Sequence, residues 1–495
     1  MVALELGVVV GYLLVALAVG LVAYRVTERT PEDYYLASRS LGTVVLLFTT
    51  FATLLSAYTF FGGPNLAFAT GPEWILVMGL MDGILFAILW YVIGYRQWLI
   101  GRRHDYVTLG EMLGDRFGST ALRGAVAAIS LFWLFPYVML QQMGAGEAMV
   151  GLTDGAVPFW VGAGGITLFM IVYVALAGLR GIAWTDTVQG LFMLVMVWAT
   201  AAVVLDAVGG AGAATAALAD SKPGFLALGG GLYTAQFVIA TAVYVAFGVA
   251  MFPQINQRFF VARSETVFRR TFTLWPVLVL LLFVPAFMLG AWAAGLGLSV
   301  PAGANVVPVL LNEYAPTWFA ALVIAGAMAA MMSSSDSMLL SGSSYFTRDI
   351  YRPFLDLDGY SEDLVARVGV VAFATLSFLA SLVAPGTLVE IGNTAFGGFA
   401  QLALPVAVAL YWTGTTRDGM FAGVLGSQVF YVGNLAAVIA GVAEGMAALG
   451  PMFYLGWHPA IPGMLLGLAL TVGVSAVTSP ATEEDQSVSR PAGAD

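Results

Sequence analysis

Five polar residues stand together in the middle of a long apolar stretch, in the order Ser333, Ser334, Ser335, Asp336 and Ser337. Hydroxyl and carboxylate oxygens are the ligands that hard cations prefer. A carboxylate within a membrane span is costly unless it faces a protein interior, so the cluster is a candidate cation site. The alternative is structural, because serines in membrane helices often bond a carbonyl of the preceding turn, and Asp336 could accept bonds from the neighbouring hydroxyls.

Carboxylates are otherwise few inside the apolar stretches, where the remaining ones are Asp82, Glu147, Asp186 and Glu390. Asp186 lies near one end of its stretch, so it could serve an ion path or simply be a helix-end charge paired with an arginine. Glu147 and Glu390 lie near the opposite ends, where water is expected. Asp82 is given no role.

Other catalytic or metal-binding groups are scarce. The chain has no cysteine, and its two histidines, His104 and His458, lie outside the apolar stretches. Thiolate sites, disulfides and histidine metal sites are therefore not expected. The scarcity of such groups indicates that the protein is not expected to be an enzyme.

Membrane helices must position these groups, because 60% of the 495 residues are apolar and only 10% are charged. Each apolar stretch is long enough to cross a hydrocarbon layer of about 30 Å as a helix. The sequence predicts an all-α polytopic membrane protein, with residues 1–480 as a single transmembrane domain. The roughly thirteen expected spans cover residues 4–24, 43–70, 73–96, 121–150, 156–178, 182–207, 230–252, 270–296, 317–346, 364–384, 388–412, 418–440 and 460–478.

The basic residues predict the orientation, since short loops rich in arginine and lysine stay in the cytoplasm. With the N-terminus outside, all eighteen arginines, including Arg258, fall on the inner side, and only Lys222 falls outside. The acidic tail, residues 481–495, is then cytoplasmic. The chain is expected in the cytoplasmic membrane, and its net charge of −10 gives no reason to expect nucleic acid as a partner.

Helix-breaking residues occur in two spans. The second contains Gly62-Gly63-Pro64, and the seventh contains Gly229-Gly230-Gly231 near its start and Gly248 before Pro253. Interrupted helices at matching places predict an inverted repeat, with one repeat over residues 43–207 and the other over 230–412. The alternative is that glycine and proline are simply common in membrane helices.

Several motifs, in order, resemble the sodium:solute symporter family over about residues 30–420. They are Asp33–Gly42, Tyr106–Gly118, Gly178–Gln189 and Ser333–Tyr351. The resemblance implies a leucine-transporter-like core of five plus five helices, with one peripheral helix before it and two after.

The resemblance also implies a sodium site. Positions that match the family's site are the backbone carbonyls of Ala52, Leu55 and Ala330 and the hydroxyls of Ser333 and Ser334. By the same resemblance Asp186 corresponds to a residue of the inner sodium exit path. Leu54 departs from the family, several members of which have a polar or acidic residue there.

Four residues could line the solute cavity by position, namely Tyr58, Tyr137, Gln141 and Tyr244. Aromatic residues in membrane proteins also serve packing and interface belts, and that alternative stays open. The expected function is sodium-coupled symport of a monocarboxylate, an amino acid such as proline, or pantothenate. A proton-coupled symporter using Asp186 or Asp336 and a non-transporting membrane sensor are the rivals, and the oligomeric state is open.

Overall fold

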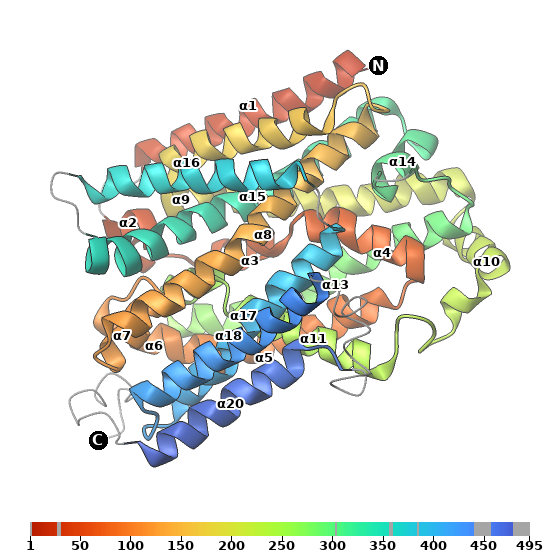
Figure 1. Cartoon of the computed structure of the whole chain (residues 1–495). Helices are drawn as coiled ribbons and strands as arrows, with labels where there is room; N and C mark the ends of the chain where they lie inside the picture. The colour runs from red at the N-terminus through yellow and green to blue at the C-terminus, as the bar shows by residue number, and fades with distance from the viewer. Residues whose placement is uncertain are drawn as a thin grey trace.

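The described part of the protein is a bundle of helices. A computed structural model describes residues 2–26, 31–301, 304–355, 360–383, 386–439 and 457–478. Within these ranges there is no strand, only an isolated bridge between Leu41 and Ala262. The long helices run alongside one another, with the N-terminal helix α1 at one edge and the C-terminal helix α20 at the other (Figure 1). Helices satisfy their backbone polar groups internally, as a chain in lipid requires.

The elements follow one another along the chain in short succession. The α-helices are α1 (Val2–Val26), α2 (Pro31–Leu36), α3 (Thr43–Leu54), α4 (Gly63–Thr70), α5 (Gly83–Leu89), α6 (Tyr95–His104), α7 (Leu109–Arg116), α8 (Thr120–Leu152), α9 (Phe159–Val208), α10 (Ala211–Ser221), α11 (Ala235–Ala250), α12 (Pro253–Phe260), α13 (Glu265–Gly295), α14 (Val306–Tyr314), α15 (Thr317–Ser344), α16 (Glu362–Ser381), α17 (Leu388–Tyr411), α18 (Arg417–Ile439) and α20 (Ala460–Val477). The 3-10 and π-helical segments are η1 (Ala37–Arg39), η2 (Tyr58–Gly62), η3 (Ile75–Asp82), η4 (Trp90–Gly94), η5 (Pro223–Leu226) and η6 (Tyr345–Leu355).

Membrane-spanning length is reached by nine helices of the described residues, or eleven if each of two bent helix pairs counts as one span. Two shorter apolar helices, Ala3–Val19 and Phe159–Val174, fall where the first and fifth spans were expected. The all-helical polytopic architecture is therefore confirmed. The number thirteen stays a prediction, as do the repeat boundaries.

Helix α9 contains two apolar portions, Phe159–Val174 and Leu179–Val208. The hydroxyls of Tyr173 and Thr185 lie 2.7 Å apart. Twelve residues of straight helix would separate these positions by about 18 Å. The chain direction therefore changes between the two portions, which agrees with the expected fifth and sixth spans.

The first interrupted span joins α3 to η2 and α4 through a bend of 62°. The helix stops before Leu55, which is extended with φ −77° and ψ 117°. Backbone N–H groups freed by the break find side-chain partners. Ala57 donates to Oε1 of Gln141 at 2.9 Å, and Tyr58 donates to Oγ of Ser56 at 3.2 Å. The break is thus held by a side chain from α8 as well as by its own residues.

A break in the second span was predicted, but its predicted position is wrong. Gly62 and Gly63 are helical, and Pro64 sits in the first turn of α4, where its missing N–H costs nothing. A Cβ on Gly63 would overlap the ring of Phe287, and one on Gly290 would overlap the carbonyl of Pro64. These glycines allow α4 and α13 to pack closely rather than interrupting a helix.

The second interrupted span joins α11 to α12 through a bend of 59°. Pro253 opens α12 and lacks the N–H that would continue the helix. Asn256 Nδ2 donates to the carbonyls of Ala250 and Phe252, at 3.2 and 2.8 Å, so the carbonyls freed by the break are satisfied. The predicted interruption near Pro253 is confirmed. Residues 229–231 lie in the loop before α11 and do not interrupt it.

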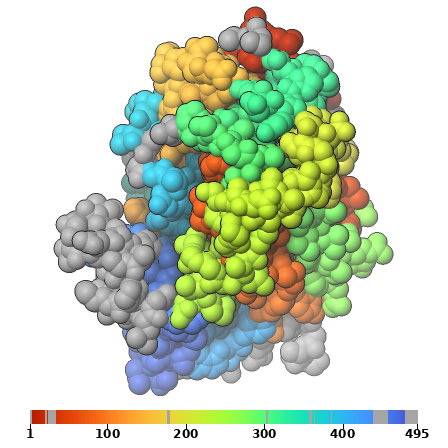
Figure 2. All heavy atoms as spheres, turned by 90° about the vertical axis from the view of Figure 1, so that its right-hand side faces the viewer, coloured from red at the N-terminus to blue at the C-terminus, as the bar shows by residue number. Residues whose placement is uncertain are grey.

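One end of the bundle is covered by the segment that contains α10 and η5, which crosses the face seen in Figure 2. Ser221 Oγ donates to the carbonyl of Gly295 at 3.1 Å, and Trp292 Nε1 donates to Thr215 at 3.0 Å. The hydroxyls of Tyr233 and Thr70 lie 2.8 Å apart. The segment therefore packs onto the ends of α4 and α13.

Candidate ion and solute site

The end of α3 presents backbone carbonyls to α15. Ser334 Oγ lies 2.6 Å from the carbonyl oxygen of Leu55 and 2.9 Å from that of Thr53. All three residues are buried. A hydroxyl carries one hydrogen, so it cannot fully satisfy both carbonyls. Three oxygens thus share one proton in an apolar interior, an arrangement suited to a hard cation.

Asp186 of α9 joins the same region. Its Oδ1 accepts a hydrogen bond of 2.5 Å from Ser333 of α15, and its Oδ2 accepts one of 2.6 Å from Thr49 of α3. Asp186 and Ser333 are fully buried. The Asp186 carboxylate therefore links α3, α9 and α15. Its partner Ser333 is the residue directly before Ser334 in α15.

Arg258 of α12 completes this cluster. Its guanidinium is fully buried, with Nη2 3.4 Å from Oδ2 of Asp186. The same nitrogen donates to Ser337 at 2.6 Å and to Thr49 at 3.2 Å, and Nη1 donates to the carbonyl of Gln254 at 3.2 Å. A charge in such surroundings needs an anionic partner, which Asp186 supplies.

The sequence predicts Arg258 to be a cytoplasmic loop arginine like the others, and this prediction is wrong, because the side chain lies inside the bundle. The expected seventh span ends at residue 252, before Arg258, so the sequence pattern gave no signal for this role, whereas the structure extends the span through α12 to Phe260.

The five residues of the expected sodium site lie on α3 and α15 or directly beside them. Leu55 and Ser334 are in contact, and Ser333 points to Asp186. Ala52 and Ala330 are fully buried on the same two helices, each one turn before its partner residues. The second and ninth spans are therefore in contact at Leu55 and Ser334, two of the positions to which the family resemblance points.

Asp336 lies apart from these contacts. Its side chain is buried, and its Oδ1 has no hydrogen-bond partner in the part of the chain that the structure describes. The neighbouring hydroxyls turn elsewhere, since Ser335 donates to the carbonyl of Met331 at 2.7 Å and Ser337 accepts from Arg258. Asp336 is therefore not the acceptor for the serine cluster.

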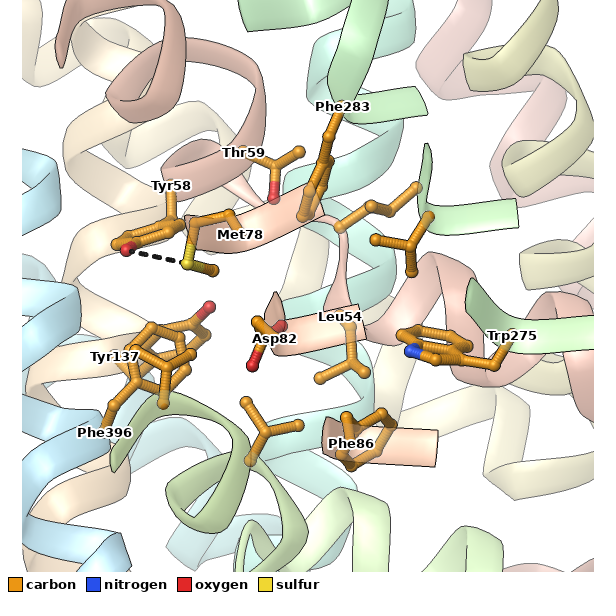
Figure 3. A pocket seen from close by; sticks show the side chains of 14 residues that line it. Leu54, Tyr58, Thr59, Met78, Asp82, Phe86, Tyr137, Trp275, Phe283 and Phe396 are labelled. Carbon is orange, nitrogen blue, oxygen red and sulfur yellow. Dashed lines mark hydrogen bonds between the residues drawn. The ribbon is translucent and has the colours of Figure 1, made fainter. Parts of the chain in front are cut away.

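A pocket lies next to the break in α3, between the two interrupted spans (Figure 3). Its lining is mostly apolar and comes from eight helical segments. The lining residues are Leu54, Leu55, Tyr58, Thr59, Met78, Asp82, Phe86, Tyr137, Val245, Val249, Trp275, Val279, Phe283 and Phe396. Apolar walls with a few polar groups are typical of sites for small organic molecules.

Two of the expected solute residues, Tyr58 and Tyr137, line this pocket. The Tyr58 hydroxyl donates to Oδ1 of Asn393 at 2.8 Å, and the hydroxyls of Tyr137 and Ser56 lie 3.2 Å apart. Both phenols are thus held by neighbours, with their rings facing the pocket.

The other two expected residues, Gln141 and Tyr244, do not line it. Gln141 Nε2 donates to the carbonyl of Tyr137 at 3.1 Å, and its Oε1 receives the N–H freed at the break in α3. Tyr244 is buried and stacks on His458, with ring centroids 4.4 Å apart. In this arrangement Gln141 supports the break, and Tyr244 packs against His458 rather than forming part of the pocket lining.

Comparison with known proteins agrees with this architecture. A model of the sodium:solute symporter family matches residues 34–426. The sodium/pantothenate symporter of Escherichia coli (strain K12) is 28% identical over 473 residues, which cover 94% of this chain and 95% of that protein. The sodium/proline symporter of the same organism is 25% identical over 483 residues, with 92% and 89% covered.

A solved structure of a Na+-coupled sialic acid symporter has a TM-score of 0.75 at 20% identity, covering 97% of this chain and 99% of that one. This likeness confirms the leucine-transporter-like fold. The family consists of transporters, so the protein is not an enzyme. The chain is a multi-pass membrane protein that belongs to the sodium:solute symporter family.

Proposed function

We propose that this protein couples the downhill movement of Na+ to the uptake of a small organic solute by alternating access. Family membership and the sodium-coupled relatives support the coupling ion. The observation that carries the proposal is the contact between the Ser334 hydroxyl and the Leu55 carbonyl at a broken helix. Relatives that carry pantothenate, proline and monocarboxylates set the range of solutes.

The proposed sodium ligands are the carbonyls of Ala52, Leu55 and Ala330 and the hydroxyls of Ser333 and Ser334. Each supplies a hard oxygen, and none requires deprotonation. Ser333 and Ser334 stand three and four residues after Ala330, which places all three on one face of α15. The contacts of Ser334 with α3 support convergence of the two helices on one point.

Asp186 and Asp336 are proposed to lie along the ion path. Asp186 bonds Ser333, so an ion leaving that hydroxyl reaches a carboxylate within one step. Arg258 balances the charge of Asp186, which limits how long a cation remains there. Asp336 has a buried oxygen with no partner in the described residues, so it could receive a proton or an ion.

The solute is proposed to bind in the pocket of Figure 3, against Tyr58 and Tyr137, with Gln141 and Tyr244 as supporting residues. Leu55 connects the two sites, because it lines the pocket while its carbonyl faces Ser334. A cation that fixes this backbone therefore also fixes one wall of the pocket. This shared wall is a physical route by which sodium would favour solute binding.

The sodium gradient is sufficient for uphill transport. A tenfold gradient supplies about 1.4 kcal/mol, and an inside-negative potential of 100 mV adds about 2.3 kcal/mol per charge. Together they would sustain accumulation of roughly several-hundred-fold at one sodium per neutral solute.

Uptake by purified protein in proteoliposomes tests the proposal. We expect accumulation of a labelled solute when sodium is outside only, and its collapse when sodium is equal on both sides and the potential is zero. Accumulation that persists without a sodium gradient would exclude sodium coupling.

Proton coupling is the second candidate, and the buried unpartnered oxygen of Asp336 is the observation that favours it. A pH step in sodium-free buffer would then drive uptake, and Asp336→Asn would abolish that uptake. A non-transporting sensor would bind solute without accumulating it in either experiment.

A further inference from the structure

Asp82 is the carboxyl group of the solute pocket. It stands at the end of η3, and its side chain lies among the lining residues, with Tyr58 and Tyr137 on one side and Leu54 and Trp275 on the other (Figure 3). The pocket lining contains no arginine, lysine or histidine among the described residues. An acid group therefore sets the charge of this pocket.

The carboxyl of Asp82 has a buried oxygen, Oδ1, without a hydrogen-bond partner among the described residues. The pocket hydroxyls of Tyr58 and Tyr137 are engaged by Asn393 and Ser56. Because buried polar atoms are normally hydrogen-bonded, an unpartnered acid oxygen at a pocket wall indicates a partner that comes from the ligand.

Arg258 does not supply a positive charge to the pocket. The buried Arg258 bonds Asp186, Thr49 and Ser337, which do not line the pocket. Beside an ionised Asp82, a solute carboxylate would meet a like charge in apolar surroundings, and such contacts are strongly unfavourable. Simple monocarboxylates and pantothenate, whose only charged group is a carboxylate, fit this position poorly.

We propose that the transported solute carries a protonated amine, which donates a hydrogen bond to Asp82, on a body that packs against the apolar walls. The walls suit such a solute, since Phe86, Trp275, Phe283 and Phe396 supply aromatic faces and edges. Aromatic rings also attract cations, which adds to the selectivity for an ammonium group. The free space between the side chains is small, so the amine compound enters as the lining side chains move apart.

This inference rests on the proposed transport function and narrows its solute class. Among the three classes considered, it selects amino-acid-like amines over amine-free carboxylates. A zwitterion keeps its own carboxylate at the end of the pocket away from Asp82.

The test is a binding screen on the purified full-length protein in detergent. Thermal stabilisation is measured in sodium for amino acids, amines, monocarboxylates and pantothenate. Each amine is paired with the analogue that has carbon in place of the amine nitrogen. We expect the best ligands to carry the amine, and each analogue to bind at least tenfold more weakly.

The best amine is then titrated against Asp82→Asn, Asp82→Glu and the control Glu390→Gln. Glu390 is exposed and caps α17, a position where glutamine serves equally well, so its variant keeps wild-type affinity. We expect Asp82→Asn to weaken amine binding at least tenfold and Asp82→Glu to weaken it less. Stabilisation by sodium alone, retained in all variants, shows that each is folded.

Three results of the binding experiments would overturn the inference: a screen in which no amine stabilises the protein, a best ligand without an amine, or unchanged affinity in Asp82→Asn. The last result would mean that Asp82 acts as a neutral acid, because asparagine keeps the size and the hydrogen bonding but not the charge. Sodium-dependent uptake of an amine-free anion would refute this inference and leave the proposed function intact. Amine transport that does not depend on sodium would refute the proposed sodium coupling and leave this inference intact.

Discussion

Removal of the Ser334 hydroxyl is the most direct perturbation of the proposed ion site. Ser334→Ala deletes the oxygen that lies 2.6 Å from the Leu55 carbonyl and 2.9 Å from the Thr53 carbonyl. Ser335→Ala is a matched control, because Ser335 is the adjacent buried serine, and its only hydrogen-bond partner among the described residues is the carbonyl of Met331, in its own helix. The two variants remove the same atom type at consecutive positions of α15.

The expected size of the effect follows from the type of contact. A polar interaction with a charged group contributes about 1.5–3 kcal/mol. Each 1.4 kcal/mol corresponds to about a tenfold change in an equilibrium constant. Ser334→Ala should therefore raise the sodium concentration for half-maximal uptake by about 10- to 100-fold, whereas Ser335→Ala should change it by less than about threefold.

Two assays check this expectation. Sodium-dependent uptake in proteoliposomes gives the half-maximal concentration, and thermal stabilisation by sodium without solute separates ion binding from transport. The maximal uptake at saturating sodium should be largely retained in Ser334→Ala. If Ser334→Ala and Ser335→Ala have the same sodium dependence in both assays, the hydroxyl is not a sodium ligand and the reasoning is refuted.

The remaining predictions address the surroundings of this site. Asp186→Asn leaves Arg258 buried without its anion and should cost about 3–5 kcal/mol of stability, seen as a lower Tm, whereas Asp186→Asn combined with Arg258→Gln should recover much of the loss. Gln141→Leu removes the acceptor for the Ala57 N–H and should cost about 1–3 kcal/mol, with weaker sodium stabilisation; an unchanged Tm would show that the break is held in another way. Because the chain has no cysteine, Lys222→Cys should be the single site labelled by an impermeant thiol reagent added outside whole cells, and labelling only after lysis would reverse the proposed orientation.

Composition was enough to predict an all-helical membrane protein, since lipid permits few solutions other than a helical bundle, whereas the leucine-transporter-like core was implied by the family resemblance. The serine cluster was identifiable because five polar residues in one apolar stretch must face an interior. Its convergence with the second span followed from the family resemblance, and contacts such as Ser334 to Leu55 agree with it.

The sequence alone could not predict the residue at which the second span breaks. Glycine and proline mark places where a helix can stop, but the helix stops at Leu55 because Gln141, more than eighty residues away in sequence, receives the freed N–H. Gly63 instead provides room for Phe287. A local pattern cannot distinguish a glycine used for bending from one used for close packing.

Arg258 and Asp82 show a second limit. Their types and positions were visible, yet side-chain direction depends on which helices meet around them. Arg258 was counted as a loop charge, although Asp186 compensates it inside the bundle. Asp82 could be recognised as costly, but only the arrangement of the neighbouring helices places it in the pocket.

Leu55 offers its main-chain oxygen to the proposed ion while its side chain forms part of the solute wall. A ligand supplied by the main chain survives almost any replacement of the side chain attached to it. Evolution can therefore redesign the wall at this residue and at its neighbour Leu54 without losing the coordinating oxygen. Because the main-chain ligand does not depend on the side chain, one ion-coupling site can serve chemically different solutes as genes duplicate and diverge.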